Sequence, residues 1–109
     1  MSNQSLQARR DAAVVRGISN MLPVYVERAE NAEVWDVEGR RFIDFAGGIA
    51  VLNTGHRHPK VMDAVRKQAD AFTHTCFMVT PYESFVALAE KLNELTPGTH
   101  AKKTGFFTT

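Results

Sequence analysis

The sequence F-A-G-G-I-A-V-L-N-T-G-H-R-H-P, Phe45 to Pro59, separates a β-rich part of the chain from a helical part. It carries glycines at positions 47, 48 and 55, which indicates backbone that turns sharply or lies close to another group. Residues 49–52 are apolar, so the stretch is not a solvated linker. The local sequence leaves two interpretations open, a tight packing corner or a wall against which a ligand rests.

Before this stretch, hydrophobicity alternates with a period of two and predicts a three-stranded antiparallel meander over residues 24–28, 33–37 and 41–45. Turns are expected at Glu30-Asn31 and at 36–39, where Asp36 accepts from backbone amides and Gly39 takes the left-handed conformation. We expect four side chains to pack in a core: Trp35, Val37, Ile43 and Phe45. A short helix with a thin apolar face is predicted over residues 5–15.

After this stretch, the apolar residues follow helical spacing. One helix is predicted to begin at Pro59 and to continue to about Phe72. A second is predicted to begin with Thr80 as its cap and Glu83 completing a capping box, and to end before Pro97-Gly98. Residues 72–79 are expected to be β-rich or irregular, and residues 102–109 to begin a buried strand.

Composition places limits on the function. The chain has 109 residues, 44% hydrophobic and 23% charged, with a net charge of +1. These values are ordinary for one small globular domain and give no sign of nucleic-acid or acidic-membrane binding. No apolar run reaches the length of about 18 residues that a membrane helix needs. Cys76 is the single cysteine, so no intrachain disulfide forms, which fits a reducing, cytoplasmic setting.

Few residues suggest chemistry by themselves. His56 and His58 form one close pair and His74 and Cys76 another, but a zinc site needs three or four converging ligands, so no metal site is expected. Cys76 is expected to be a buried thiol rather than a nucleophile. Gly47-Gly48 lacks the pattern of a phosphate-binding loop.

The run from Ala29 to Val61, A-E-N-A-E-V-W-D-V-E-G-R-R-F-I-D-F-A-G-G-I-A-V-L-N-T-G-H-R-H-P-K-V, resembles the N-terminal part of class III, pyridoxal-phosphate-dependent aminotransferases. The later sequence T-H-T-C-F, residues 73–77, followed by Tyr82-Glu83, is similar to the bacterial branch that uses 4-aminobutyrate. Relatives that act on ornithine or acetylornithine share much of this pattern, so they remain an alternative.

The resemblance implies an α+β fragment of an α/β type I aminotransferase fold. It places residues 1–58 in the N-terminal part of a small domain and residues 59–109 in the helices and first strand leading into a large cofactor domain. Family members are about four times longer and act as homo-oligomers, so we expect this chain to be part of a longer enzyme that folds poorly by itself. An unpaired apolar strand at residues 106–107 would favour association.

The implied reaction moves an amino group from 4-aminobutyrate or a similar ω-amino acid to 2-oxoglutarate, giving succinate semialdehyde and glutamate. The implied cofactor is pyridoxal 5'-phosphate. Two groups of residues are implied to border the site, Gly48, Ile49 and Ala50 as a substrate-side wall, and Cys76, Phe77 and Met78 near the cofactor or the subunit interface. Met78 departs from the glutamine usual at its position.

The resemblance places the Schiff-base lysine of the family further along the sequence. None of the lysines here matches it: Lys60, Lys67, Lys91, Lys102 and Lys103. We therefore expect no catalytic residue in this chain and no activity from it alone. An inert fragment that acts only as an interaction module is the alternative.

Overall fold

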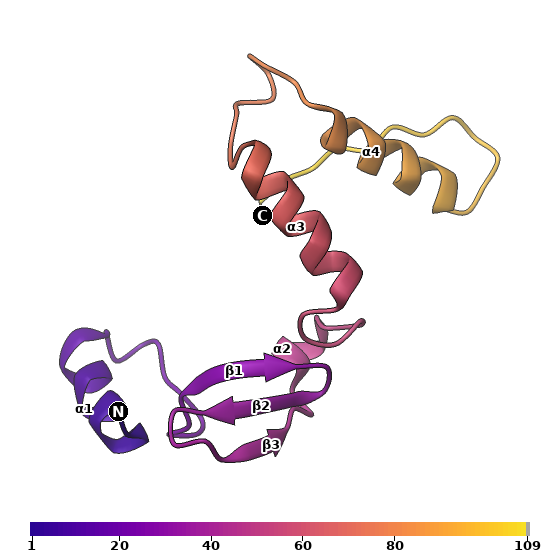
Figure 1. Ribbon diagram of the computed structural model, residues 1–109. Coiled ribbons are helices and arrows are strands. Elements are labelled where there is room, and N and C mark those ends of the chain that lie inside the picture. Colours follow the sequence, from indigo (N-terminus) through magenta and orange to yellow (C-terminus); the bar gives the residue numbers. More distant parts are fainter. Residues whose placement is uncertain (109) are drawn as a thin grey trace. The chain divides into compact units, whose positions relative to one another are not determined.

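The computed structural model describes residues 1–108 (Figure 1). Within them the chain forms the α+β arrangement of helices and one antiparallel sheet expected for this part of the fold. The chain divides into two compact units, Met1–Lys67 and the residues from Gln68 onward.

The first unit contains the predicted meander. Its strands are β1 (Val26–Glu30), β2 (Glu33–Asp36) and β3 (Arg41–Ile43), in the order β1-β2-β3 (Figure 1). Both pairs are antiparallel, and Trp35 lies opposite Arg28 on one side and Arg41 on the other. The alternating pattern therefore located this sheet correctly, with boundaries that shift by about two residues.

Both turns have the expected chemistry. Asn31 joins β1 to β2 with φ +50°, a left-handed conformation that asparagine tolerates. In the second turn the Asp36 carboxylate accepts hydrogen bonds from the backbone N–H groups of Glu38 and Arg40, at 3.0 and 2.9 Å. Gly39 takes φ +79° there, as predicted.

Helix α1 (Asn3–Ala13) begins two residues earlier than predicted. Ser2 caps it, because its hydroxyl accepts from Ser5 N–H while the Ser5 hydroxyl receives Ser2 N–H. The helix is tied to the sheet through Asn3, whose side-chain amide donates to Asp36 at 2.8 Å and accepts from Tyr25 N–H at 2.7 Å.

Polar residues are the most buried part of the described chain. Asp36 is 1% exposed and Asn3 is 5% exposed, and among residues 1–108 no hydrophobic side chain is fully buried. The predicted core of the meander is therefore wrong for two side chains, since Ile43 is 57% and Phe45 94% exposed. Trp35 is half-buried, with the Arg28 guanidinium 3.5 Å from its ring centre.

Burial and hydrogen bonding act in opposite directions on Asp36. Burial raises the pKa of a carboxyl group, but hydrogen bonds from the Arg40 backbone, the Asn3 amide, the Arg40 guanidinium and the Glu38 backbone outweigh it and lower the pKa of Asp36 to about 2. The Arg40 Nε atom lies 2.8 Å from the carboxylate. Asp36 is thus a buried anion whose donors come from both α1 and the β2–β3 turn.

After β3 the chain forms the single turn α2 (Gly47–Ala50) and then α3 (Pro59–Ala71). Helix α3 begins at Pro59 as predicted, because proline suits the first helical position. Its apolar face is partly open, with Val61 49% and Val65 52% exposed. Among the described residues no helix has the length and apolar character to span a membrane.

The second unit contains α4 (Glu83–Leu95) and a cluster of five aromatic rings: Phe72, Phe77, Tyr82, Phe85 and Phe106. Phe85 lies at its centre, stacked on Phe77 with ring centres 3.9 Å apart and edge-on to Phe106 at 4.6 Å. The predicted cap is wrong, since Tyr82 occupies the N-cap position and makes no side-chain cap hydrogen bond. The Tyr82 ring instead packs edge-on against Phe72 and Phe77, with ring centres 5.5 Å apart in both pairs.

Two further predictions are wrong. Residues 101–108 form no strand, because no strand among the described residues lies beside them, and Phe106 packs on Phe85 instead. The last residue of the predicted strand, Thr109, lies outside the described residues. Cys76 is exposed rather than buried, and residues 72–79 are irregular.

Candidate active-site wall

The segment after β3 has an unusual backbone. Four consecutive residues have positive φ values, namely +51° at Gly47, +64° at Gly48, +63° at Ile49 and +60° at Ala50. Glycine accepts this region freely, but a β-branched residue such as isoleucine does so only under strain, at a cost of about 1–3 kcal/mol. Strained backbone of this kind persists where neighbouring contacts hold it, and it is often found at functional sites.

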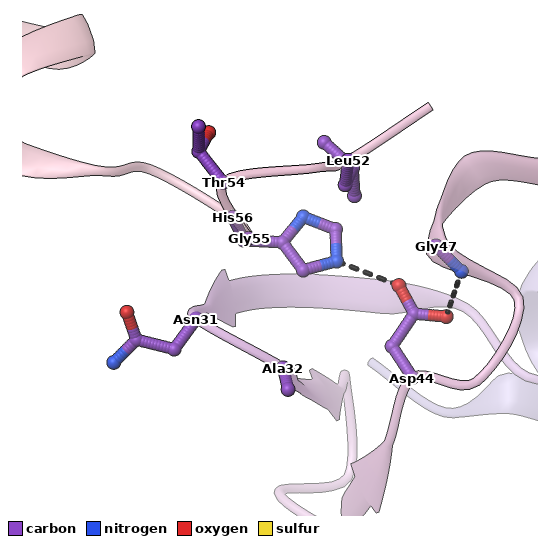
Figure 2. Close-up of a pocket in the computed structure, with 8 residues that line it drawn as sticks. All are labelled: Asn31, Ala32, Asp44, Gly47, Leu52, Thr54, Gly55 and His56. Atoms are coloured by element: carbon purple, nitrogen blue, oxygen red, sulfur yellow. Dashed lines mark hydrogen bonds and ion pairs between the residues drawn. The ribbon is translucent and has the colours of Figure 1, made fainter. Parts of the chain in front are cut away.

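Two hollows lie beside this segment in the first unit. One has a volume of about 430 Å³ and is lined by Phe45, Ala46, Gly47, Ile49, Ala50, Leu52 and Asn53. The other has a volume of about 330 Å³ and is lined by Asn31, Ala32, Asp44, Gly47, Leu52, Thr54, Gly55 and His56 (Figure 2). Because Ile49 is 89% exposed, the strained turn presents an apolar side chain outward.

Asp44 anchors the start of the turn. Its Oδ1 atom accepts from the N–H groups of Ala46 and Gly47, at 3.1 and 2.9 Å. Its Oδ2 atom lies 2.7 Å from His56 Nε2, and Figure 2 shows these side chains facing each other. The His56 ring, followed by the Gly47 N–H, holds the pKa of Asp44 below its usual value.

His56 is itself held by the sheet. Its N–H donates to Asn31 C=O at 2.7 Å, and its C=O accepts from Asn31 N–H at 3.0 Å. Gly55 permits this approach, because a Cβ atom there would lie 2.9 Å from the Asn31 carbonyl oxygen and φ is +74°. A continuous set of contacts therefore runs from the β1–β2 turn through His56 and Asp44 to the strained turn.

The structure brings together only some of the predicted site residues. Gly48, Ile49 and Ala50 lie in one turn, and Ile49 and Ala50 line the larger hollow. Cys76, Phe77 and Met78 belong to the second unit, where Met78 is 92% exposed and Phe77 is stacked on Phe85. Among residues 1–108, no group of three or more His, Cys, Asp or Glu side chains is placed to hold a metal ion.

Sequence reasoning missed the pairing of Asp44 with His56. The residues are 12 positions apart, and only the fold of the intervening turn brings them together. One local signal for Asp44 was present, since an Asp side chain in a turn commonly accepts from the backbone N–H two residues on, here that of Ala46.

A family model described as aminotransferase class-III matches residues 14–109. This chain belongs to the class III aminotransferases. The resemblance noted in the sequence is thereby confirmed. Membership of this family implies that the parent enzyme uses pyridoxal 5'-phosphate as its cofactor.

Curated relatives of this class III aminotransferase chain act on ω-amino acids by name. This chain is 58% identical over 103 residues to the 5-aminovalerate aminotransferase DavT of Pseudomonas aeruginosa. The match covers 94% of this chain and 24% of that protein. The chain is 54% identical over 108 residues to the 4-aminobutyrate aminotransferase GabT of Escherichia coli, covering 99% of this chain and 25% of that protein. The chain thus spans about a quarter of the length of these relatives.

Solved structures show the same fold. The acetylornithine aminotransferase of Elizabethkingia anophelis matches with a TM-score of 0.80 at 26% identity, over 87% of this chain and 24% of that one. The ornithine δ-aminotransferase of Plasmodium falciparum matches with a TM-score of 0.79 at 26% identity, over the same shares. The type I aminotransferase fold expected from the sequence is confirmed by these neighbours.

The two hollows beside the strained turn do not fit the cofactor by themselves. Pyridoxal phosphate brings a phosphate dianion and an aldehyde, which call for donors or cations and for an amine. None of the side chains lining the larger hollow is charged, and the smaller hollow contains the Asp44 carboxylate, which repels phosphate. Of the two, the larger hollow therefore supplies an apolar surface.

Proposed function

We propose that this chain is the N-terminal part of a pyridoxal-phosphate-dependent transaminase that moves the amino group of 4-aminobutyrate to 2-oxoglutarate, giving succinate semialdehyde and glutamate. The observation that supports this most directly is the 54% identity to the Escherichia coli 4-aminobutyrate aminotransferase over 108 residues. Residues elsewhere in the enzyme would hold the cofactor, and this chain alone would be inactive.

A second amino donor has specific support. The relatives at 58% and 56% identity are 5-aminovalerate aminotransferases from two Pseudomonas species. The two donors differ by one methylene group, and an apolar site separates such substrates by only about 1–3 kcal/mol. We therefore keep 5-aminovalerate as the alternative donor of the same reaction.

In this proposal Gly48, Ile49 and Ala50 form the wall that borders the substrate. The exposed Ile49 side chain and the strained turn support this role. Cys76, Phe77 and Met78 are proposed to lie near the cofactor or the interface of a homo-oligomer, where the exposed Met78 would be covered. The enzyme is proposed to be cytoplasmic, since a chain with one exposed thiol fits a reducing compartment.

The proposed division into domains follows from the resemblance. Residues 1–58 would belong to the small domain and residues 59–109 would lead into the large cofactor domain. In the longer enzyme, the open apolar faces of α3 and α4 would pack against other parts of that enzyme, because exposed apolar surface of this extent usually marks an interface.

The test is an assay of the full reading-frame product, meaning the protein encoded by the whole open reading frame that contains these residues. Purified with pyridoxal phosphate, it should form glutamate from 2-oxoglutarate with 4-aminobutyrate or 5-aminovalerate as donor, and only slowly with ornithine or acetylornithine. Faster turnover of ornithine or acetylornithine would transfer the chain to that branch. Absence of turnover with all four donors would favour the inert interaction module.

A further inference from the structure

The Asp44–His56 pair connects the sheet to the proposed substrate wall. The Asp44 Oδ1 atom accepts hydrogen bonds from the Ala46 and Gly47 N–H groups. The Oδ2 atom pairs with His56 Nε2. The Asp44 and His56 side chains are 16% and 21% exposed, so water competes only weakly for these hydrogen bonds. Both residues lie within one compact part of the chain, the unit Met1–Lys67.

The strained turn needs such an anchor. Ile49 is 89% exposed, so packing of its own side chain within the described residues does little to hold φ at +63°. The turn closes by hydrogen bonds of Ile49 and Ala50 N–H to Ala46 C=O, at 2.7 and 3.2 Å. The Ala46 N–H group donates to the Asp44 carboxylate. The carboxylate therefore orients the Ala46 peptide groups, and through them the turn.

The carboxylate in turn depends on His56. The imidazole donates from Nε2–H in the neutral tautomer that carries this proton and also when protonated, so the contact needs no particular charge state. The two hydrogen bonds between His56 and Asn31 fix the histidine backbone against the β1–β2 turn. Figure 2 shows Asp44 between the His56 ring and the Gly47 N–H.

We propose that Asp44 and His56 are positioning residues that hold the Gly47–Ala50 turn in its left-handed conformation and thereby set the chain-length selectivity for the amino donor. The selectivity part rests on the proposed function. A wall displaced by the length of a methylene group would change which of two donors differing by one methylene fits better. Neither residue contacts the substrate in this account, because both act through the turn.

The test compares variants of the full reading-frame product. In His56→Ala, peptides covering residues 45–52 should exchange backbone hydrogen for deuterium faster, and the ratio of kcat/KM for 4-aminobutyrate to that for 5-aminovalerate should change about ten-fold. His56→Gln should restore both values, because its amide N–H can replace Nε2–H. His58→Ala is the matched control, since it removes an imidazole two residues away and should leave both values unchanged.

The outcomes separate the two proposals. Absence of turnover in the wild type contradicts the proposed function and the selectivity role, while the exchange rates still decide whether the pair holds the turn. An active wild type with an unchanged donor ratio and unchanged exchange in His56→Ala overturns the inference alone. If His56→Ala unfolds, the glutamine variant decides, because an unfolded or altered His56→Gln would contradict a role carried by the Nε2–H hydrogen bond.

Discussion

The two units of this chain are held by different kinds of contact. In Met1–Lys67 the two buried residues, Asp36 and Asn3, are polar and belong to one network. The partly buried Asp44 and His56 form another. From Gln68 onward the rings of Phe77, Tyr82 and Phe85 meet face to face and edge to face. Hydrogen bonds have strict angular limits, so they fix backbone torsions, whereas ring packing fills volume and tolerates small rotations.

This difference fits the roles proposed for the two units, a substrate wall in the first and helix packing in the second. A substrate wall needs a backbone held to within about 0.5 Å, and a strained turn needs directional anchors. A helix that supports neighbouring parts of an enzyme needs apolar area more than exact torsions. The two kinds of contact should therefore respond differently to substitution.

Removing the central ring should have the largest effect. Phe85→Ala takes away the partner of Phe77, Tyr82 and Phe106 and should lower the free energy of unfolding of the full reading-frame product by about 3 kcal/mol, at the low end for large-to-small changes because the ring is half-buried. Phe85→Leu, which keeps most of the apolar volume, should cost about half as much. Urea unfolding measures both, and a wild-type midpoint for Phe85→Ala would show that the cluster is not needed.

Adding a single methyl group at Gly55 should test whether the close backbone contact between Gly55 and Asn31 stabilises the first unit. Gly55→Ala places a Cβ atom 2.9 Å from the Asn31 carbonyl oxygen at φ +74° and should lower the free energy of unfolding by about 2 kcal/mol. Gly39→Ala is the matched control, because φ is +79° but its Cβ atom meets nothing within 4 Å, so only about 1 kcal/mol should be lost. Equal losses would mean that the close approach of Gly55 to Asn31 is not important.

Acid should weaken the first unit through Asp36. Its pKa in the folded chain is about 2, below the ordinary 3.8, so the carboxylate stabilises the fold fully above pH 3.8 and progressively loses this contribution as the pH falls toward 2. The stability difference between wild type and Asp36→Asn should therefore shrink across that window. Circular dichroism during urea unfolding at several pH values follows it, and a difference that stays constant from pH 5 to pH 2 would contradict the lowered pKa.

An exposed ion pair should matter least. Lys91 and Glu94 lie 2.9 Å apart on α4, with side chains 57% and 67% exposed. Since solvent and salt screen such pairs, Lys91→Ala should change the free energy of unfolding by no more than about 0.5 kcal/mol. A loss as large as that of Gly55→Ala in the same urea experiment would show that surface charge, and neither buried polar groups nor rings, holds this chain.

Periodic features of the chain were predictable from sequence. The meander followed from alternation between residues 24 and 45, and α3 followed from Pro59 and the helical spacing behind it. The turn at Asp36 followed from its side-chain chemistry and Gly39. These features depend on neighbours within a few residues, which is why the sequence contains enough information to locate them.

Features that depend on distant residues were not predictable. The N-cap of α4 is Tyr82 rather than the predicted Thr80, and the Tyr82 ring packs on Phe72, a contact that local capping rules do not include. The strand expected near Phe106 needed a partner strand beside it. In the candidate site, the turn at residues 47–50 was singled out by its glycines, but the His56 contact to Asp44 depends on how that turn folds.

One experiment tests the central comparison directly, namely hydrogen–deuterium exchange of the full reading-frame product carrying either His56→Ala or Phe85→Ala. The account predicts that His56→Ala accelerates exchange in residues 45–52 and leaves α4 at its wild-type rate, and that Phe85→Ala does the reverse. Faster exchange in both segments from either variant would contradict the claim that directional polar contacts hold the wall and ring packing holds the helix.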